Sequence, residues 1–169
     1  MTCFQRNLIA AAVLFLTCLG PATARNLPDP KSGCKLEVPD DWVNIGLGVQ
    51  SGYAVLARNP AKTKSIELYI QPVSPTATVD HESPITKGFE QGYIQSGGTV
   101  VKSEYKKLHG INFFVLTGTK KAENSTVTAM AYVCVVNSHM YQVCTYFKDG
   151  DPATDPSLAA AVDSFTILP

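Results

Sequence analysis

Hydrophobic and polar residues alternate along most of the chain beyond residue 33, as they do in β-strands that bury one face. Strands are predicted at 34–38, 52–59, 65–73, 99–108, 111–121, 125–136 and 140–149. Short turns separate the last four, so we expect these to form an antiparallel meander. The run from Val127 to Val136 is apolar at both parities, which indicates a central strand covered on both faces.

The periodicity changes between residues 83 and 98, where a helix is predicted. Ser83 suits the N-cap and Pro84 the first turn, where a missing N–H costs nothing. An apolar stripe and a terminating glycine pair follow, formed by Ile85, Phe89, Tyr93 and Gly97-Gly98. We expect Phe89 to be buried under the sheet.

Two glycines lie inside this predicted helix, although each costs about 1 kcal/mol relative to alanine. Gly88 and Gly92 are four residues apart and therefore share one face of the helix. Our interpretation is that they let the helix approach the sheet closely. A contact in a dimer is the alternative.

A second, shorter helix is predicted at 157–165, with Asp155 as N-cap and a proline in its first turn. Its inner side consists of Leu158, Val162 and Phe165. Together the elements predict an α+β domain, in which an antiparallel sheet of about six to seven strands carries helices on its faces.

The N-terminal residues have the organisation of a secretory signal peptide. A polar start with Arg6 precedes an apolar run at 8–19, which is too short to span a bilayer. Ala22-Thr23-Ala24 supplies the small residues for a cut before Arg25. The alternative is a lipoprotein that is cut before Cys18 and lipidated there. We expect an exported protein, either periplasmic or secreted.

This processing divides the chain into a signal peptide at 1–24, a flexible lead-in at 25–33 and one domain at 34–169. The chain has 14 basic and 14 acidic side chains, and the cut removes only Arg6, which leaves 13 basic ones. Without a basic stripe, nucleic-acid binding is not expected. Nor do we expect stable membrane insertion after the signal peptide is removed.

Three cysteines remain in the mature chain, and an oxidising compartment favours one disulfide and one leftover thiol. Cys134 and Cys144 flank the last predicted turn. In a register with Asn137 opposite Tyr141 they would face each other, so a bond between them is our first prediction. A bond from Cys34 to one of them is the alternative, and three buried thiols are the third outcome considered.

Catalytic chemistry finds little support in the sequence. The one local pairing of a nucleophile with a base, Cys134 or Cys144 with His139, combines an apolar thiol with a turn histidine directed at solvent. His81 and His109 also fall in loops, which does not predict a metal site. No nucleophile-elbow, phosphate-loop or zinc-protease motif occurs. We therefore expect neither enzyme activity nor a cofactor.

The order of elements resembles the PsbP-like superfamily, and the stretches KLEVPDDW at 35–42, HGINFFVLTG at 109–118 and AAAVDSFTIL at 159–168 carry the likeness. That superfamily includes the extrinsic photosystem II protein PsbP, a yeast nuclear-transport factor that binds the GTPase Ran, and exported bacterial proteins such as DcrB. The resemblance covers roughly residues 34–168 and implies a generally non-catalytic protein. It also implies that Trp42 packs across the end of the sheet; an exposed ring that stacks on a ligand is the alternative.

Two hypotheses for the function are compatible with these features. The first is a non-enzymatic exported cell-envelope protein that serves as a chaperone- or adaptor-like binding factor for another macromolecule, with a protein as the expected partner. The second is a small-molecule binder with a pocket between helix and sheet, lined by Trp42, Phe89 and Tyr93. A deep apolar pocket with convergent polar groups would favour the second, and a flat exposed apolar patch the first.

Overall fold

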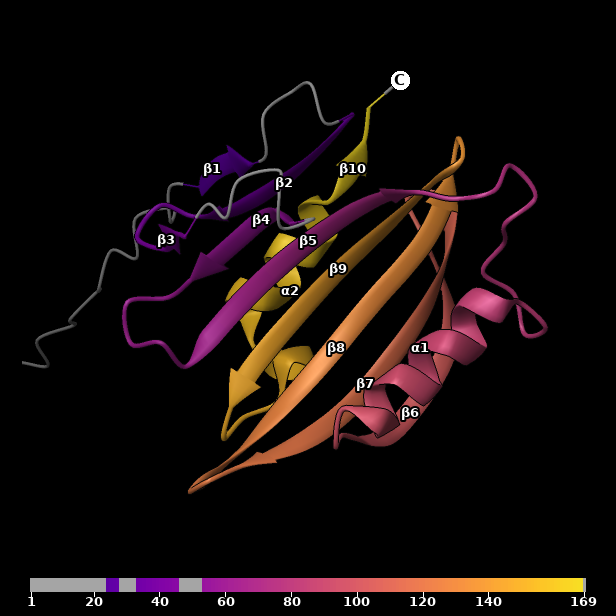
Figure 1. Cartoon of the computed structure of the whole chain (residues 1–169). Coiled ribbons are helices and arrows are strands. Elements are labelled where there is room, and N and C mark those ends of the chain that lie inside the picture. Colours follow the sequence, from indigo (N-terminus) through magenta and orange to yellow (C-terminus); the bar gives the residue numbers. More distant parts are fainter. Residues whose placement is uncertain (1–23, 28–32, 46–52, 169) are drawn as a thin grey trace, which may run out of the picture.

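The computed structural model describes residues 24–27, 33–45 and 53–168. Seven of the described strands form one antiparallel sheet in the order β3-β4-β5-β9-β8-β7-β6 (Figure 1). Their bounds are β3 Val43–Asn44, β4 Tyr53–Arg58, β5 Lys64–Pro72, β6 Thr99–Leu108, β7 Ile111–Ala122, β8 Ser125–Val136 and β9 His139–Lys148. This architecture confirms the predicted α+β class and the predicted size of the sheet.

The last four strands are the predicted meander. Positive φ at both central residues of the His109-Gly110 and Asn137-Ser138 turns matches the twist of antiparallel hairpins. β8 pairs with β7 on one side and with β9 on the other, and its residues enter hydrophobic clusters on both faces of the sheet. The prediction of a doubly covered central strand is confirmed.

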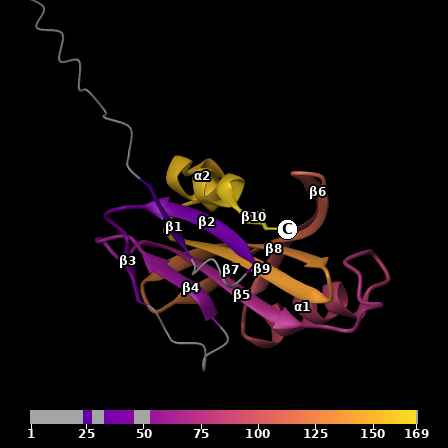
Figure 2. The same ribbon diagram turned by 90° about the horizontal axis from the view of Figure 1, so that it is seen from above.

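A second layer covers one face of the large sheet (Figure 2). It consists of a small sheet in the order β1-β2-β10 and of helix α2, with bounds β1 Ala24–Leu27, β2 Cys34–Pro39, α2 Pro156–Ser164 and β10 Thr166–Ile167. Alternate residues of β2 are fully buried in the core between the layers: Cys34, Leu36 and Val38. Helix α1, Pro84–Gln95, lies on the opposite face of the large sheet.

The segment before β2 differs from expectation in part. Residues 25–33 were expected to form a flexible lead-in, but Ala24–Leu27 is a strand that pairs with β2. Backbone pairing with an open strand edge outweighs the proline and glycine content that suggested flexibility. The Arg25 guanidinium also donates a hydrogen bond to the backbone carbonyl of Trp42. The predicted signal peptide lies outside the described residues, apart from Ala24.

Both helices begin at their predicted caps. The hydroxyl of Ser83 accepts a hydrogen bond from the N–H of Ile85 at 3.1 Å, and Asp155 caps α2 in the same way. After α1 the chain turns at Gly97, whose φ of +84° is the left-handed conformation expected beyond a helix end. In the described ranges, no helix has the length and apolar character needed to cross a membrane.

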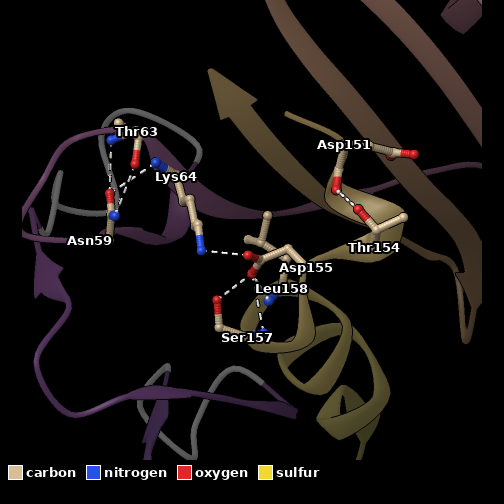
Figure 3. A network of polar contacts seen from close by, with 8 residues as sticks. All are labelled: Asn59, Thr63, Lys64, Asp151, Thr154, Asp155, Ser157 and Leu158. Atoms are coloured by element: carbon tan, nitrogen blue, oxygen red, sulfur yellow. Dashed lines mark hydrogen bonds and ion pairs between the residues drawn. The ribbon is translucent and has the colours of Figure 1, made fainter. Parts of the chain in front are cut away.

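Asp155 also connects two distant parts of the chain (Figure 3). Its carboxylate accepts hydrogen bonds from the N–H groups of Ser157 and Leu158, at 3.2 and 3.1 Å. It also forms an ion pair with the ammonium of Lys64, at the start of β5. The Lys64 ammonium nitrogen in turn lies 4.9 Å from the centroid of the Phe147 ring. Burial alone would raise the pKa of Asp155, but the hydrogen bonds from Lys64 and from the start of α2 hold that pKa below its usual value. The pair therefore anchors α2 to the large sheet.

The register between β8 and β9 is incompatible with the first predicted disulfide. Cys134 lies opposite Tyr141 and Cys144 opposite Ala131, which puts the two thiols on opposite faces of the sheet. The prediction assumed a turn of three residues, whereas the hairpin has a turn of two. This difference puts Cys144 on the opposite face of the sheet from Cys134. Cys134 and Cys34 share the core under β2 and α2. The described residues contain no disulfide.

Candidate functional site

A cavity of about 500 Å³ lies between α1 and the large sheet, on the face opposite to β2 and α2. Helix α1 forms one wall, and side chains of β5, β7, β8 and β9 form the rest. The helix residues that line it recur at spacings of three and four: Ile85, Gly88, Phe89, Gly92, Tyr93 and Ser96. The predicted apolar stripe of this helix therefore faces the cavity.

Small residues on both sides keep this space open. Gly88 and Gly92 face it from α1, and Ala129 and Ala131 face it from β8. A Cβ atom added at either glycine would have no atom within 4 Å, and Thr86 is the one buried residue of α1. The interpretation that these glycines let helix and sheet touch is therefore wrong, because they border open space.

Tyr93 is the residue that brings α1 and the sheet into close contact. A Cβ atom added at Gly118 of β7, or at Gly98, would lie 2.3 Å from Tyr93 Cε1. The tyrosine ring thus rests directly on two glycines. Phe89, which was expected to be buried under the sheet, is only half-buried because it borders the cavity.

The strand wall of the cavity carries polar groups. β9 presents Met140, Gln142, Cys144 and Tyr146 to it at alternate positions, and Gln71 of β5 lies opposite Met140. The amide nitrogen of Gln142 donates to Cys144 Sγ at 3.0 Å. That of Gln71 lies 4.0 Å from Met140 Sδ. Because sulfur is a weak acceptor, both amides retain hydrogen-bonding capacity toward a ligand.

The cavity wall is uncharged: none of the described side chains that line it belongs to Asp, Glu, Lys, Arg or His. Glu67 of β5 lies beside the cavity, opposite Cys144 of β9. Burial raises the pKa of Glu67, although a hydrogen bond from Tyr146 and the charge of Arg58 oppose the rise. Burial also raises the pKa of the Cys144 thiol to about 12, so this thiol stays protonated at neutral pH and is a poor nucleophile.

Trp42 lies away from this cavity. It is 4% exposed and belongs to the main core, between the large sheet and the layer of β2 and α2. Its burial agrees with the packing role that the resemblance implies. Of the three candidate ligand residues, Phe89 and Tyr93 line the cavity and Trp42 does not. Ligand contact by Phe89 and Tyr93 stays a prediction.

The other candidate chemistry is dispersed. His139 is exposed, and its Nδ1 lies 2.9 Å from the carbonyl oxygen of Asn137 in the turn. Cys134 is fully buried on the other face of the sheet, where burial raises the pKa of its thiol to about 12. In the part of the chain that the structure describes, no three His, Cys, Asp or Glu side chains gather as metal ligands.

Two residues of the strand wall, Gln71 and Gln142, were not predicted. The available signal is parity, because Gln142 alternates with Tyr141 and Val143 and thus joins the side chains directed at α1. The position of Gln142 opposite Val133 of β8 depends on the β8–β9 register, which hydrophobic alternation alone does not specify.

This arrangement of strands and helices has counterparts among solved structures. The solution structure of cyanobacterial PsbP (CyanoP) from Synechocystis matches with a TM-score of 0.66 at 13% identity, over 89% of this chain and 95% of CyanoP. The Ran-binding protein Mog1p of Saccharomyces cerevisiae matches with a TM-score of 0.59 at 10% identity, over 87% of this chain and 96% of Mog1p. The chain has the PsbP/Mog1-like fold. The resemblance inferred from the sequence is confirmed at the level of the fold.

A third protein with the PsbP/Mog1-like fold is LpqN, which is involved in cell envelope biogenesis of Mycobacterium tuberculosis. It matches with a TM-score of 0.51 at 16% identity, over 87% of this chain and 91% of LpqN. No family model and no curated protein matches the chain. At these identities the likeness establishes the PsbP/Mog1-like fold, and the function has to be argued from the cavity under α1.

Proposed function

We propose that this chain is an exported, non-enzymatic binding protein that holds a small, largely apolar molecule in the cavity under α1. The observation that carries the proposal is the cavity itself, a largely apolar space of about 500 Å³ whose wall includes two amide side chains. Small-molecule sites in proteins have volumes of roughly 300–1,000 Å³ and combine apolar walls with a few polar groups. The second hypothesis from the sequence is therefore the better supported one.

The chemistry of the wall favours binding over catalysis. Its one thiol, Cys144, is held in the protonated form by burial, which raises the pKa of that thiol to about 12. A nucleophile of this kind would need an adjacent base to lower its pKa, whereas Glu67, opposite Cys144, does not line the cavity and its charge raises the pKa of the thiol further. The polar groups that remain are amides and hydroxyls, which orient a ligand but do not transform it.

Native mass spectrometry of the exported protein tests the proposal. The wild type should carry a small molecule, and Gly92→Leu should lose it, because the new side chain extends into the cavity. Gln91→Leu is the matched control, since Gln91 is exposed on the same helix and does not line the cavity. The proposal is wrong if the wild type carries no small molecule, or if Gly92→Leu retains it as Gln91→Leu does.

A macromolecular partner is the second candidate function. Mog1p, which has the same fold, is a Ran-binding protein, and this supports a protein partner for the present chain. The described exposed hydrophobic side chains supply no single docking patch, because Val43 and Val101 lie at opposite edges of the large sheet. Retention of a protein partner by Gly92→Leu but not by a variant of an edge strand would favour this second candidate.

A further inference from the structure

The cavity under α1 extends along the whole helix and across strands β5, β9, β8 and β7. α1 and its C-cap line it from Pro84 to Ser96, and β9 lines it from Met140 to Tyr146. With rises of about 1.5 Å per residue in a helix and about 3.3 Å in a strand, both walls are roughly 18–20 Å long. α1 runs along the strands beneath it (Figure 1). A volume of about 500 Å³ over this length gives a cross-section of about 25 Å², which suits one extended hydrocarbon chain.

The two ends of the cavity differ in chemistry. Tyr93 rests on Gly118, and Gly118 shares a row across the sheet with Ala129 and Tyr146, so two tyrosine rings lie at this end. Gln71 lies at the other end of the same wall and is exposed. The cavity therefore has tyrosine rings at one end and an exposed amide side chain at the other.

The polar end favours an uncharged group. Gln71 and Gln142 each offer an amide donor and an amide acceptor, and their hydrogen bonds among the described residues go to sulfur atoms. No lining cation is present to pair with a carboxylate or a phosphate.

We propose that the ligand is a neutral, single-chain amphiphile, a molecule such as a monoacylglycerol or a fatty amide. Its hydrocarbon chain lies between α1 and the alanines of β8, and its ester, amide or hydroxyl head group bonds to Gln71 and Gln142. This inference rests on the proposed function, and it adds the shape of the ligand and the charge of its head group.

Three probes of equal chain length test the inference: monodecanoylglycerol, decanoate and decyltrimethylammonium. Each is titrated calorimetrically into the exported protein at neutral pH, below the concentration at which the probe forms micelles. Monodecanoylglycerol should bind at least tenfold more tightly than decanoate or decyltrimethylammonium, because the two amides can both donate to and accept from its head group, whereas a charged head group meets no lining residue of opposite charge. Gly92→Leu should abolish binding of all three, and Gln91→Leu should leave it unchanged.

Variants of Gln142 separate the head-group claim from the pocket claim. Gln142→Leu should weaken monodecanoylglycerol about tenfold while a bare alkane chain is unaffected, because one hydrogen bond is lost. Gln142→Lys should make decanoate the preferred probe, because the ammonium supplies the missing cation.

Each result bears on one claim. Equal binding of the three probes, or tighter binding of a charged one, overturns the neutral head group while the pocket function stands. Binding of none of them, with a small molecule still present on the native protein, overturns the chain-like shape. If the native protein carries no small molecule either, the proposed function itself fails.

Discussion

The pair formed by Lys64 and Asp155 should account for much of the attachment of α2 to the large sheet. Replacing Asp155 with alanine removes the N-cap of α2, which costs about 0.5–2 kcal/mol. It also breaks an ion pair whose side chains are 24% and 7% exposed, for Lys64 and Asp155 respectively. An exposed ion pair contributes about 0.2–1 kcal/mol, whereas loss of one partner of a buried pair costs about 3–5 kcal/mol. Because this pair is partly buried, we assign about 1–2 kcal/mol to the loss of the ion pair. We expect Asp155→Ala to lower the free energy of unfolding by about 1.5–4 kcal/mol.

Two further variants divide this loss between the cap and the ion pair. Asp155→Asn keeps an oxygen that can cap the helix and should cost about 1–2 kcal/mol. Combined with Lys64→Met in a double-mutant cycle, it should give a coupling energy of about 1 kcal/mol. Asp151→Ala is the control, because Asp151 caps only the three-residue 3₁₀ helix η3, Pro152–Thr154, and should cost less than about 1 kcal/mol.

Urea unfolding followed by the fluorescence of Trp42 measures these values, since this single tryptophan is 4% exposed in the folded protein. Because the pKa of Asp155 is held below its unfolded value of about 3.9, its contribution is present above that pH and is lost as the pH falls. The difference between wild type and Asp155→Asn should therefore shrink in acid. A loss for Asp155→Ala no greater than for Asp151→Ala would refute the role of the pair.

Further predictions concern the glycines, the thiols and the N-terminus. Gly92→Ala should raise the free energy of unfolding by about 0.5–1 kcal/mol, because the added methyl meets no atom. Gly118→Ala should lower the free energy of unfolding by about 1–3 kcal/mol, because the added methyl would clash with the Tyr93 ring. The opposite order in a urea titration would contradict both assignments. Burial raises the pKa of Cys134 and Cys144 to about 12, so stability should be full below about pH 8.5 and fall by about 2 kcal/mol per thiol at pH 10. Cys134→Ala should reduce this loss of stability between about pH 8.5 and pH 10. An unchanged loss would contradict the assignment of the effect to the Cys134 thiol. N-terminal sequencing of the exported protein should begin at Arg25, and a lipidated start at Cys18 would contradict this processing.

The features that were predicted from the sequence are those that local physics decides. Alternation in β2 identifies Cys34, Leu36 and Val38 as one face, because successive side chains of a strand point to opposite sides. Ser83 and Asp155 mark the helix starts, because their side chains satisfy N–H groups that lack partners within the helix. Such signals need no knowledge of the neighbouring strand, and they were sufficient for both α-helices and the longer strands, but not for the short strands β1, β3 and β10.

The features that escaped prediction depend on how strands pair. Asn137 and Ser138 both have positive φ, which makes a two-residue turn, whereas the sequence was compatible with a turn of three. That single residue decides whether Cys134 and Cys144 face each other or lie on opposite faces. The same register places Cys144 and Tyr146 opposite the alanines of β8, so the strand wall of the cavity could not be predicted, for the same reason as the disulfide.

The glycines of α1 give the strongest physical reason to regard the cavity as functional. Each glycine in a helix interior costs about 0.5–1 kcal/mol relative to alanine, and close packing is the usual structural compensation. At Gly88 and Gly92 that compensation is absent, because a Cβ atom at either position would meet nothing within 4 Å. The helix therefore gives up stability for empty space, on the face where β8 also presents its two shortest lining side chains, Ala129 and Ala131. The proposed ligand, lying between the two walls, would account for the small residues on both of them.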